Sequence, residues 1–180
     1  KGTGEIEVAH ADISWFGYAI AATYGSTGQV SVTDSAFTTP PDQLDASGNR
    51  YQSRVGITGC TTATFARNTF TGTSLETYKC NAAINNNVFD RSLEPLTVSS
   101  HPDLAKVSLS GSNTNTFTGQ NSEKAVYLNG TVGSGDTWVL DKVAVYDLSI
   151  VEVRGTLRVE PGTILKSQTG GSGSQGGITV

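Results

Sequence analysis

The chain has 180 residues, of which 36% are hydrophobic and only 16% charged, and twelve Lys and Arg against sixteen Asp and Glu give a formal net charge of −4. This low charge, together with 21 glycines, favours strands joined by tight turns over helices, which draw on Ala, Leu, Glu, Lys and Arg. The acidic balance argues against a nucleic-acid partner, and no apolar run reaches the ~20 residues needed to span a bilayer.

Short segments rich in β-branched residues recur along the chain. They alternate apolar with polar residues, as half-buried strands do, and they cover residues 30–33, 55–58, 107–110 and 126–128. Helical periodicity of any length is absent from the sequence. The pattern predicts an all-β fold made of short strands.

One pentapeptide is repeated without change. Asn-Thr-Phe-Thr-Gly occupies residues 68–72 and again residues 115–119, with a shortened version, Asn-Val-Phe-Asp, at residues 87–90. Upstream, residues 35–38 keep the Phe without the Asn. The irregular gaps between these Phe residues fit a coil of stacked β-rungs with loop insertions of variable length.

Stacking would give the Asn and the Phe of each repeat a physical role. Asn tolerates the left-handed backbone of a tight bend, and its amide can bond to the Asn one rung above. Phe side chains pointing inward from successive rungs would pack as offset aromatic neighbours. The sequence therefore predicts two internal ladders, one of Asn68, Asn87 and Asn115 and one of Phe70, Phe89 and Phe117.

The two cysteines, Cys60 and Cys80, fit the same coil. No Cys-x-x-Cys pair or His at ligand spacing accompanies them, which argues against a zinc site, while two isolated buried thiols remain an alternative. Aligning them brings Phe70 and Phe89 to nearly the same rung position, and stacked strands ~4.8 Å apart lie within reach of a disulfide. We expect a bridge between successive rungs, and with it an oxidising, extracytoplasmic setting.

Three stretches resemble secreted bacterial proteins with right-handed parallel β-helix repeats, which share the coil of pectate lyases. The first is residues 10–17, where a polar pair, an Ile and an aromatic pair lead into Gly. The second is the two pentapeptides followed by Ala-Val-Tyr-Leu-Asn-Gly at residues 125–130. The third is residues 150–166, in which Gly-Thr-Leu precedes Val-Glu-Pro-Gly-Thr, a pattern that in this group opens a new module.

The resemblance implies a right-handed parallel β-helix located outside the cell or on its surface. Residues 1–132 would form β-helix rungs, and residues 133–180 would form a module junction and the start of a second β-helical module. The resemblance says little about activity, because this coil hosts lyases, hydrolases, adhesins and inert stalks.

Enzymes on this coil place carboxylates, Arg or Lys on an exposed sheet face to cleave polysaccharides. The adjacent aspartates and the Gly-His-Gly of pectin hydrolases are absent from this sequence. The best acid–base pair left is His10 with Asp12, two residues apart on one expected strand and so on one face. A solvated polar face is the competing interpretation of this pair, and His101 is expected in a solvent-exposed loop. The sequence does not decide whether the protein is an enzyme.

Two further sets of residues are candidates for binding. Aromatic rings can stack on sugars, although the same rings could instead cap the rung ends; the residues concerned are Trp15, Tyr18, Tyr24 and Tyr51. Oxygen ligands could hold a structural calcium ion near the module junction, without regular ligand spacing; these are Asp136, Asp141 and Asp147. No other cofactor is expected.

These observations favour an extracellular scaffold or adhesion segment that is non-catalytic and binds polysaccharide or a cell-surface glycan. One alternative is a polysaccharide lyase or glycoside hydrolase of the β-helix type. A second is a fibre-forming structural protein that associates end to end through unpaired edge strands.

Overall fold

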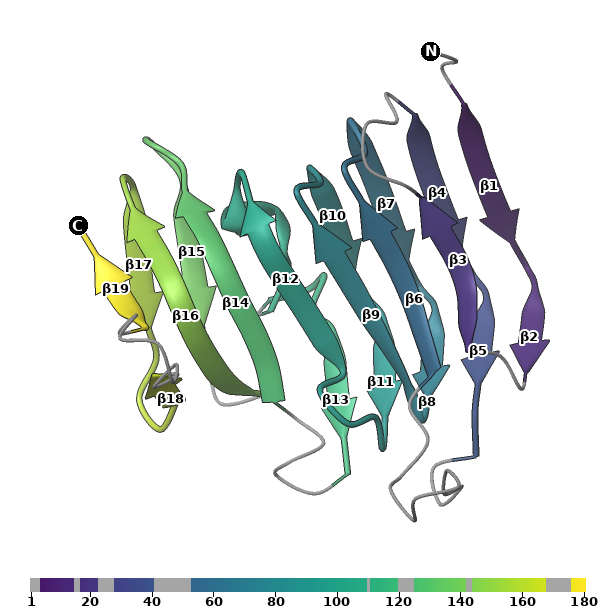
Figure 1. Cartoon of the computed structure of the whole chain (residues 1–180). Coiled ribbons are helices and arrows are strands. Elements are labelled where there is room, and N and C mark those ends of the chain that lie inside the picture. The colour runs from purple at the N-terminus through teal and green to yellow at the C-terminus, as the bar shows by residue number, and fades with distance from the viewer. Residues whose placement is uncertain are drawn as a thin grey trace.

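The computed structural model describes residues 4–14, 17–22, 28–40, 53–109, 111–119, 125–141, 144–167 and 176–180. Within them the fold is all-β, apart from one 3₁₀ turn, η1 (Leu104–Lys106). Every pair of neighbouring strands is parallel. The strands stack in order from β1 to β19 along one axis, which makes the protein a parallel β-helix (Figure 1).

Three long sheets form the sides of the coil. Sheet A contains β1 (Glu5–Ala9), β4 (Gln29–Thr33), β7 (Thr62–Ala66) and β10 (Ala82–Asn85). Sheet B contains β2 (Asp12–Ser14), β5 (Ala36–Thr38), β8 (Thr69–Thr71), β11 (Val88–Asp90) and β13 (Thr116–Thr118). Sheet C contains β3 (Tyr18–Ala22), β6 (Ser53–Thr58), β9 (Thr73–Tyr78), β12 (Leu96–His101), β14 (Ala125–Val132), β16 (Val145–Val153) and β18 (Ile164–Ser167), and β19 (Gly177–Thr179) also pairs with β16.

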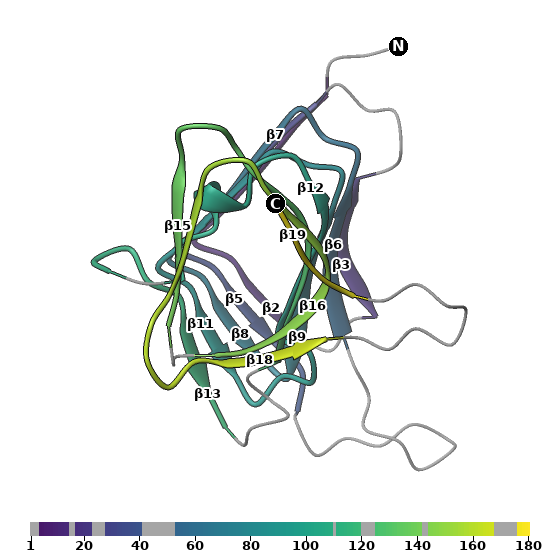
Figure 2. The same cartoon turned by 90° about the vertical axis from the view of Figure 1, so that its left-hand side faces the viewer.

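The coil is right-handed. Figure 2 looks along its axis from the end that carries the C-terminus, and the chain turns counterclockwise as it advances toward the viewer. One turn runs from sheet A through sheet B to sheet C and back to sheet A, so consecutive turns pair strand on strand. This is the hand that crossovers between parallel strands adopt almost without exception.

Sheet C crosses the predicted module boundary at residue 132 without a break, because β14 pairs with β16. Within the described residues, sheet A, in contrast, does not continue past this part of the coil. The turn η1 follows β12, where earlier coils continue into a sheet A strand, and β15 (Thr137–Leu140) pairs with β17 (Thr156–Val159) in a separate two-stranded sheet. Trp138 fills the interior at this point, 3% exposed, and its Nε1 donates to the backbone oxygen of Val107 at 2.9 Å.

The predicted phenylalanine ladder is confirmed. Phe37, Phe70, Phe89 and Phe117 stack with ring centroids 5.2, 4.9 and 5.1 Å apart and ring planes within 9° of parallel. Each lies at the middle of a three-residue strand of sheet B, whose outer neighbours face solvent or the surface. The alternation of a strand thus places one ring per coil in the core.

The predicted asparagine ladder is confirmed as well, and a serine extends it. Oδ1 of Asn87 accepts hydrogen bonds from the backbone N and from Nδ2 of Asn68, both at 3.0 Å. Asn115 does the same for Asn87, at 3.0 and 2.9 Å. Oδ1 of Asn68 accepts from the backbone N of Ser35 at 3.0 Å. The ladder supplies hydrogen-bond partners to backbone groups that the bend leaves without a strand partner.

The expected source of the bend differs from the observed one. At Ser35, Asn68 and Asn87 the left-handed backbone belongs to the residue before the ladder position, with φ of 51° at Asp34, 58° at Arg67 and 55° at Asn86. The ladder Asn therefore turns its side chain inward to bond to backbone, while its exposed or half-buried neighbour makes the bend. A buried amide without hydrogen-bond partners is costly, so the Asn side chain serves to form hydrogen bonds and the bend is made by the neighbouring residue.

The disulfide is confirmed between Cys60 and Cys80, whose Cα atoms lie 5.0 Å apart. Both residues follow strands of sheet C, so the bridge joins two successive coils at the corner between sheets C and A. Both are buried, and the backbone N of Cys60 donates to Sγ of Cys80 at 3.2 Å.

Candidate functional site

The outer face of sheet C carries aromatic residues, one of which is among the four predicted for binding. Of the four predicted, Tyr18 lies on β3 with 64% of its surface exposed. Trp15, Tyr24 and Tyr51 lie outside the described residues. Cε1 of Tyr18 lies 3.5 Å from the position that a Cβ atom would take on Gly56. The ring therefore lies over the neighbouring strand, where the missing side chain leaves room for it.

Two more tyrosines on this face were missed by the sequence analysis. Tyr78 ends β9 with 38% of its surface exposed, and Tyr127 lies half-buried between two buried residues of β14. The strand alternation in both segments, with buried residues at every second position, was the signal that could have found them. We call Tyr18, Tyr78 and Tyr127 the tyrosine face.

The register of sheet C places polar side chains between these rings. Gly56, Glu76, Thr97, Tyr127, Asp147 and Lys166 follow one another across successive strands. Tyr78 stands in the adjacent row beside Ser99. The tyrosine face thus extends over coils that are far apart in the sequence, with hydroxyl and carboxylate groups among the rings.

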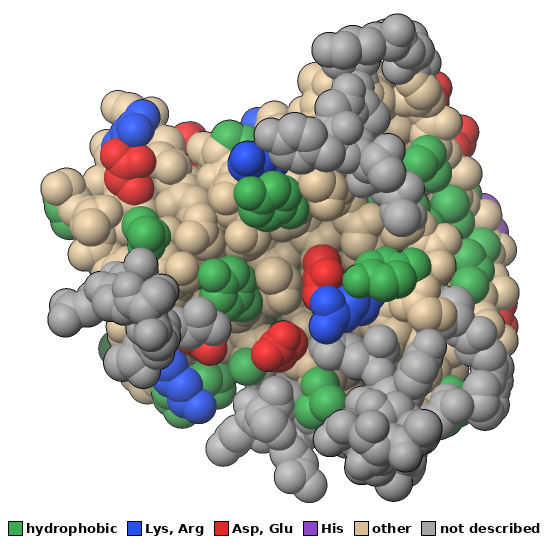
Figure 3. Space-filling view, in the orientation of Figure 1, with side chains coloured by type: hydrophobic (Ala, Val, Ile, Leu, Met, Phe, Trp, Pro, Cys, Tyr) green, Lys and Arg blue, Asp and Glu red, His purple; other side chains and the backbone are tan. Residues whose placement is uncertain are grey.

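One ion pair and one cation–π contact lie on this face. Nη1 of Arg54 lies 2.9 Å from Oε1 of Glu76, and Nζ of Lys79 lies 5.1 Å from the ring centroid of Tyr78. Figure 3 shows this side of the molecule, where hydrophobic side chains lie beside basic and acidic ones rather than in one continuous patch. At the other end of sheet C, Arg154 donates to Glu152 and lowers the pKa of that carboxyl group.

This arrangement suits a polyhydroxylated ligand. An aromatic ring offers an apolar face with a polar tip, which matches the alternating CH and hydroxyl surfaces of a sugar. The neighbouring carboxylates, hydroxyls and amides can donate to or accept from sugar hydroxyls. The ~4.8 Å spacing of stacked strands is similar to the length of one pyranose unit, so an extended glycan could meet successive coils.

The candidate acid–base pair does not share a strand. His10 follows β1 with a φ of 53°, and the chain turns there before Asp12 begins β2. Both side chains are exposed. His10 instead neighbours Asp34, on which Arg67 makes a two-pronged ion pair at 2.6 and 2.7 Å. The hydrogen bond from Arg67 is the main cause that lowers the pKa of Asp34.

Two of the three candidate calcium ligands flank one short strand, and the third lies on the next strand. Asp136 precedes β15, Asp141 follows it, and Asp147 lies within β16 on the outer face, in register with Tyr127. Among the described residues, no group of three or more His, Cys, Asp or Glu side chains could hold a metal ion.

His101 differs from the expectation of a solvent-exposed loop. It ends β12 with 1% of its surface exposed, and both ring nitrogens lie within hydrogen-bonding distance of backbone groups. The Pro-Asp that follows suggested a loop, but the turn begins only after the histidine side chain has entered the coil.

In the described part of the chain, no helix has the length and apolar character needed to cross a membrane.

Comparison with known proteins found no match to this chain among protein-family models, curated proteins or solved structures.

Proposed function

We propose that the chain is part of an extracellular β-helical scaffold or adhesion protein, and that its tyrosine face binds polysaccharide without cleaving it. The observation that carries the proposal is the placement of Tyr18, Tyr78 and Tyr127 on one face of sheet C. Rings spread over several coils suit an extended glycan better than a small molecule, which would need a concave pocket.

Two other observations support the extracellular setting. The buried Cys60–Cys80 disulfide favours an oxidising compartment. The sequence also resembles secreted bacterial proteins of the pectate-lyase-like coil. A non-catalytic role fits the neighbourhood of the rings, where Glu76 is paired with Arg54.

The test is co-sedimentation of the protein with a panel of insoluble and cross-linked polysaccharides, neutral and acidic. We expect retention on at least one of them. Tyr18→Ala, Tyr78→Ala and Tyr127→Ala should each weaken it, by roughly fivefold in Kd if a ring contributes about 1 kcal/mol. Thr116→Ala, on the exposed face of sheet B, is the matched control and should bind as the unmodified protein does.

Two results would contradict the proposal. Retention that survives all three tyrosine substitutions together would place the binding surface elsewhere. Release of soluble oligosaccharides into the supernatant would instead favour a polysaccharide lyase or hydrolase.

A further inference from the structure

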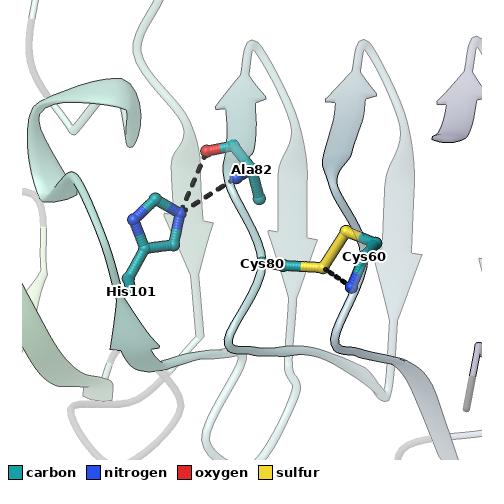
Figure 4. Close-up of a disulfide and its surroundings, with 4 residues drawn as sticks. All are labelled: Cys60, Cys80, Ala82 and His101. Atoms are coloured by element: carbon teal, nitrogen blue, oxygen red, sulfur yellow. Dashed lines mark hydrogen bonds between the residues drawn. A yellow bond between two sulfur atoms is a disulfide. The ribbon is translucent and has the colours of Figure 1, made fainter. Parts of the chain in front are cut away.

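The corner between sheets C and A carries a row of three buried side chains from successive coils: Cys60, Cys80 and His101 (Figure 4). Each follows directly on a residue with left-handed backbone, these being Gly59, Lys79 and Ser100 with φ of 71°, 50° and 52°. His101 thus occupies in its coil the position that Cys80 occupies in the coil before. The first two coils are joined by a covalent bond, and the third is joined to them by an imidazole.

The ring of His101 accepts hydrogen bonds from the backbone. Nδ1 lies 3.2 Å from the backbone N of Asp103, and Nε2 lies 3.1 Å from the backbone N and 3.2 Å from the backbone O of Ala82. In either neutral tautomer one ring nitrogen keeps a lone pair for an N–H group. The imidazolium has no lone pair: its Nε2–H can donate to the backbone O of Ala82, but its Nδ1–H would face the backbone N–H of Asp103, which loses its acceptor.

The surroundings of the ring oppose a positive charge. Burial is the main cause that lowers the pKa of His101, and it outweighs the backbone hydrogen bonds to Ala82 and Asp103 and the Asp103 charge, which raise it; the Lys106 charge lowers it further. The Asp103 carboxylate caps the start of η1, where its Oδ1 accepts a hydrogen bond from the backbone N of Ala105 at 3.0 Å. On the adjoining strands, β10 has no ionisable residue, and β14 presents Gly130 in register with His101.

The same corner is connected to the tyrosine face. The backbone N of Ser100 donates to Oδ1 of Asn129 on β14 at 3.2 Å, and Asn129 Nδ2 donates to Ser149 on β16 at 3.3 Å. A Cβ atom on Gly130 would lie 2.5 Å from the backbone O of His101, so β12 and β14 are in close contact here. His101 is paired in register with Gly130 of β14, the strand that carries Tyr127, so the two residues are directly linked across the strand pair.

We propose that His101 is an acid-sensitive latch, whose protonation loosens the corner between β12 and β14 and releases polysaccharide from the tyrosine face. This regulation rests on the function proposed above. It would let a surface-bound protein detach from its glycan when the medium becomes mildly acidic.

The direction of the pH dependence follows from linkage. The unfolded chain takes up a proton on His101 near pH 6.5, whereas the folded protein resists it until a lower pH. The contribution of His101 to folding stability is therefore constant above pH 6.5 and is lost as the pH falls below it. Over that window the unfolding equilibrium constant should rise by up to about tenfold per pH unit.

The experiment measures urea unfolding and polysaccharide retention at pH 7.5, 6.5, 5.5 and 5.0, with the disulfide kept oxidised. The unmodified protein should lose both stability and retention below pH 6.5. His101→Gln keeps a side-chain acceptor for an N–H group but does not titrate, so both properties should be flat across the range. His10→Gln changes the other histidine, which is exposed, and should behave as the unmodified protein does.

The protonation of the His101 ring can also be measured directly in the unmodified protein, so this test does not depend on the folding of a variant. The imidazole carbon-bound proton of His101, followed by NMR, should titrate below the ordinary range of histidine. Titration of His101 at the ordinary value, or equal retention at pH 7.5 and 5.0, would overturn the latch. Absence of retention at pH 7.5 would instead refute the glycan-binding function on which it rests.

Discussion

The amide of Asn68 lies on the amide of Asn87, and a single oxygen of Asn87 accepts two hydrogen bonds from Asn68, one from its side chain and one from its backbone. Asn87 Nδ2 in turn donates to the backbone O of Phe65 at 3.0 Å and to Asn115. Neighbouring coils are therefore joined at this bend by side chains as well as by strand pairing.

Asn87→Ala should be strongly destabilising. It would leave the buried amide donors of Asn68 and the carbonyl of Phe65 without these partners, and each unsatisfied buried group costs about 1–3 kcal/mol. We expect a loss of about 3–5 kcal/mol in the free energy of unfolding, measured with urea. Asn113→Ala, at an exposed turn residue, is the control and should change it by less than about 0.5 kcal/mol.

Truncation of the aromatic ladder should cost a similar amount. Phe89 is fully buried between Phe70 and Phe117, so Phe89→Ala would leave a cavity and lower the free energy of unfolding by about 3–5 kcal/mol. Phe89→Leu should cost less. Val88→Ala removes the exposed neighbour on the same strand and should cost little; equal losses at both positions would argue against the stack as a source of stability.

The disulfide should stabilise the fold chiefly by restricting the unfolded chain. Replacement of both Cys60 and Cys80 by Ser opens a loop of 20 residues and should lower the free energy of unfolding by about 3 kcal/mol. Because both residues are buried, a thiol reductant should act slowly on the folded protein and quickly in urea. Fast reduction of the native protein would show that this corner opens readily.

The close approach of β12 and β14 gives a fourth prediction. Gly130→Ala would place a methyl group against the backbone of His101, and either strand would have to move. We expect a loss of about 1–3 kcal/mol in thermal or urea unfolding. Gly177→Ala is the control, because nothing lies within 4 Å of its added Cβ atom. A neutral Gly130→Ala would mean that the two strands separate easily.

The sequence by itself determined the coil, its two ladders and its disulfide. Phe70, Phe89 and Phe117 each follow an Asn by two residues, and this offset survives every change in loop length. A repeated local pattern must occupy the same place in every coil, because each coil pairs with its neighbour in register. Cys60 and Cys80 could be aligned because Phe70 and Phe89 follow them at nearly the same distance.

The tertiary structure decided which side chains meet on the outer surface and which enter the corners. Tyr78 and Tyr127 come from coils of different length, and no local motif connects them. His101 has a polar, loop-like neighbourhood in the sequence, and only the stacking of its coil on Cys80 and Ala82 buries it. Inward ladders repeat because the core constrains them, whereas outer faces and corners depend on how many residues each turn of the coil contains.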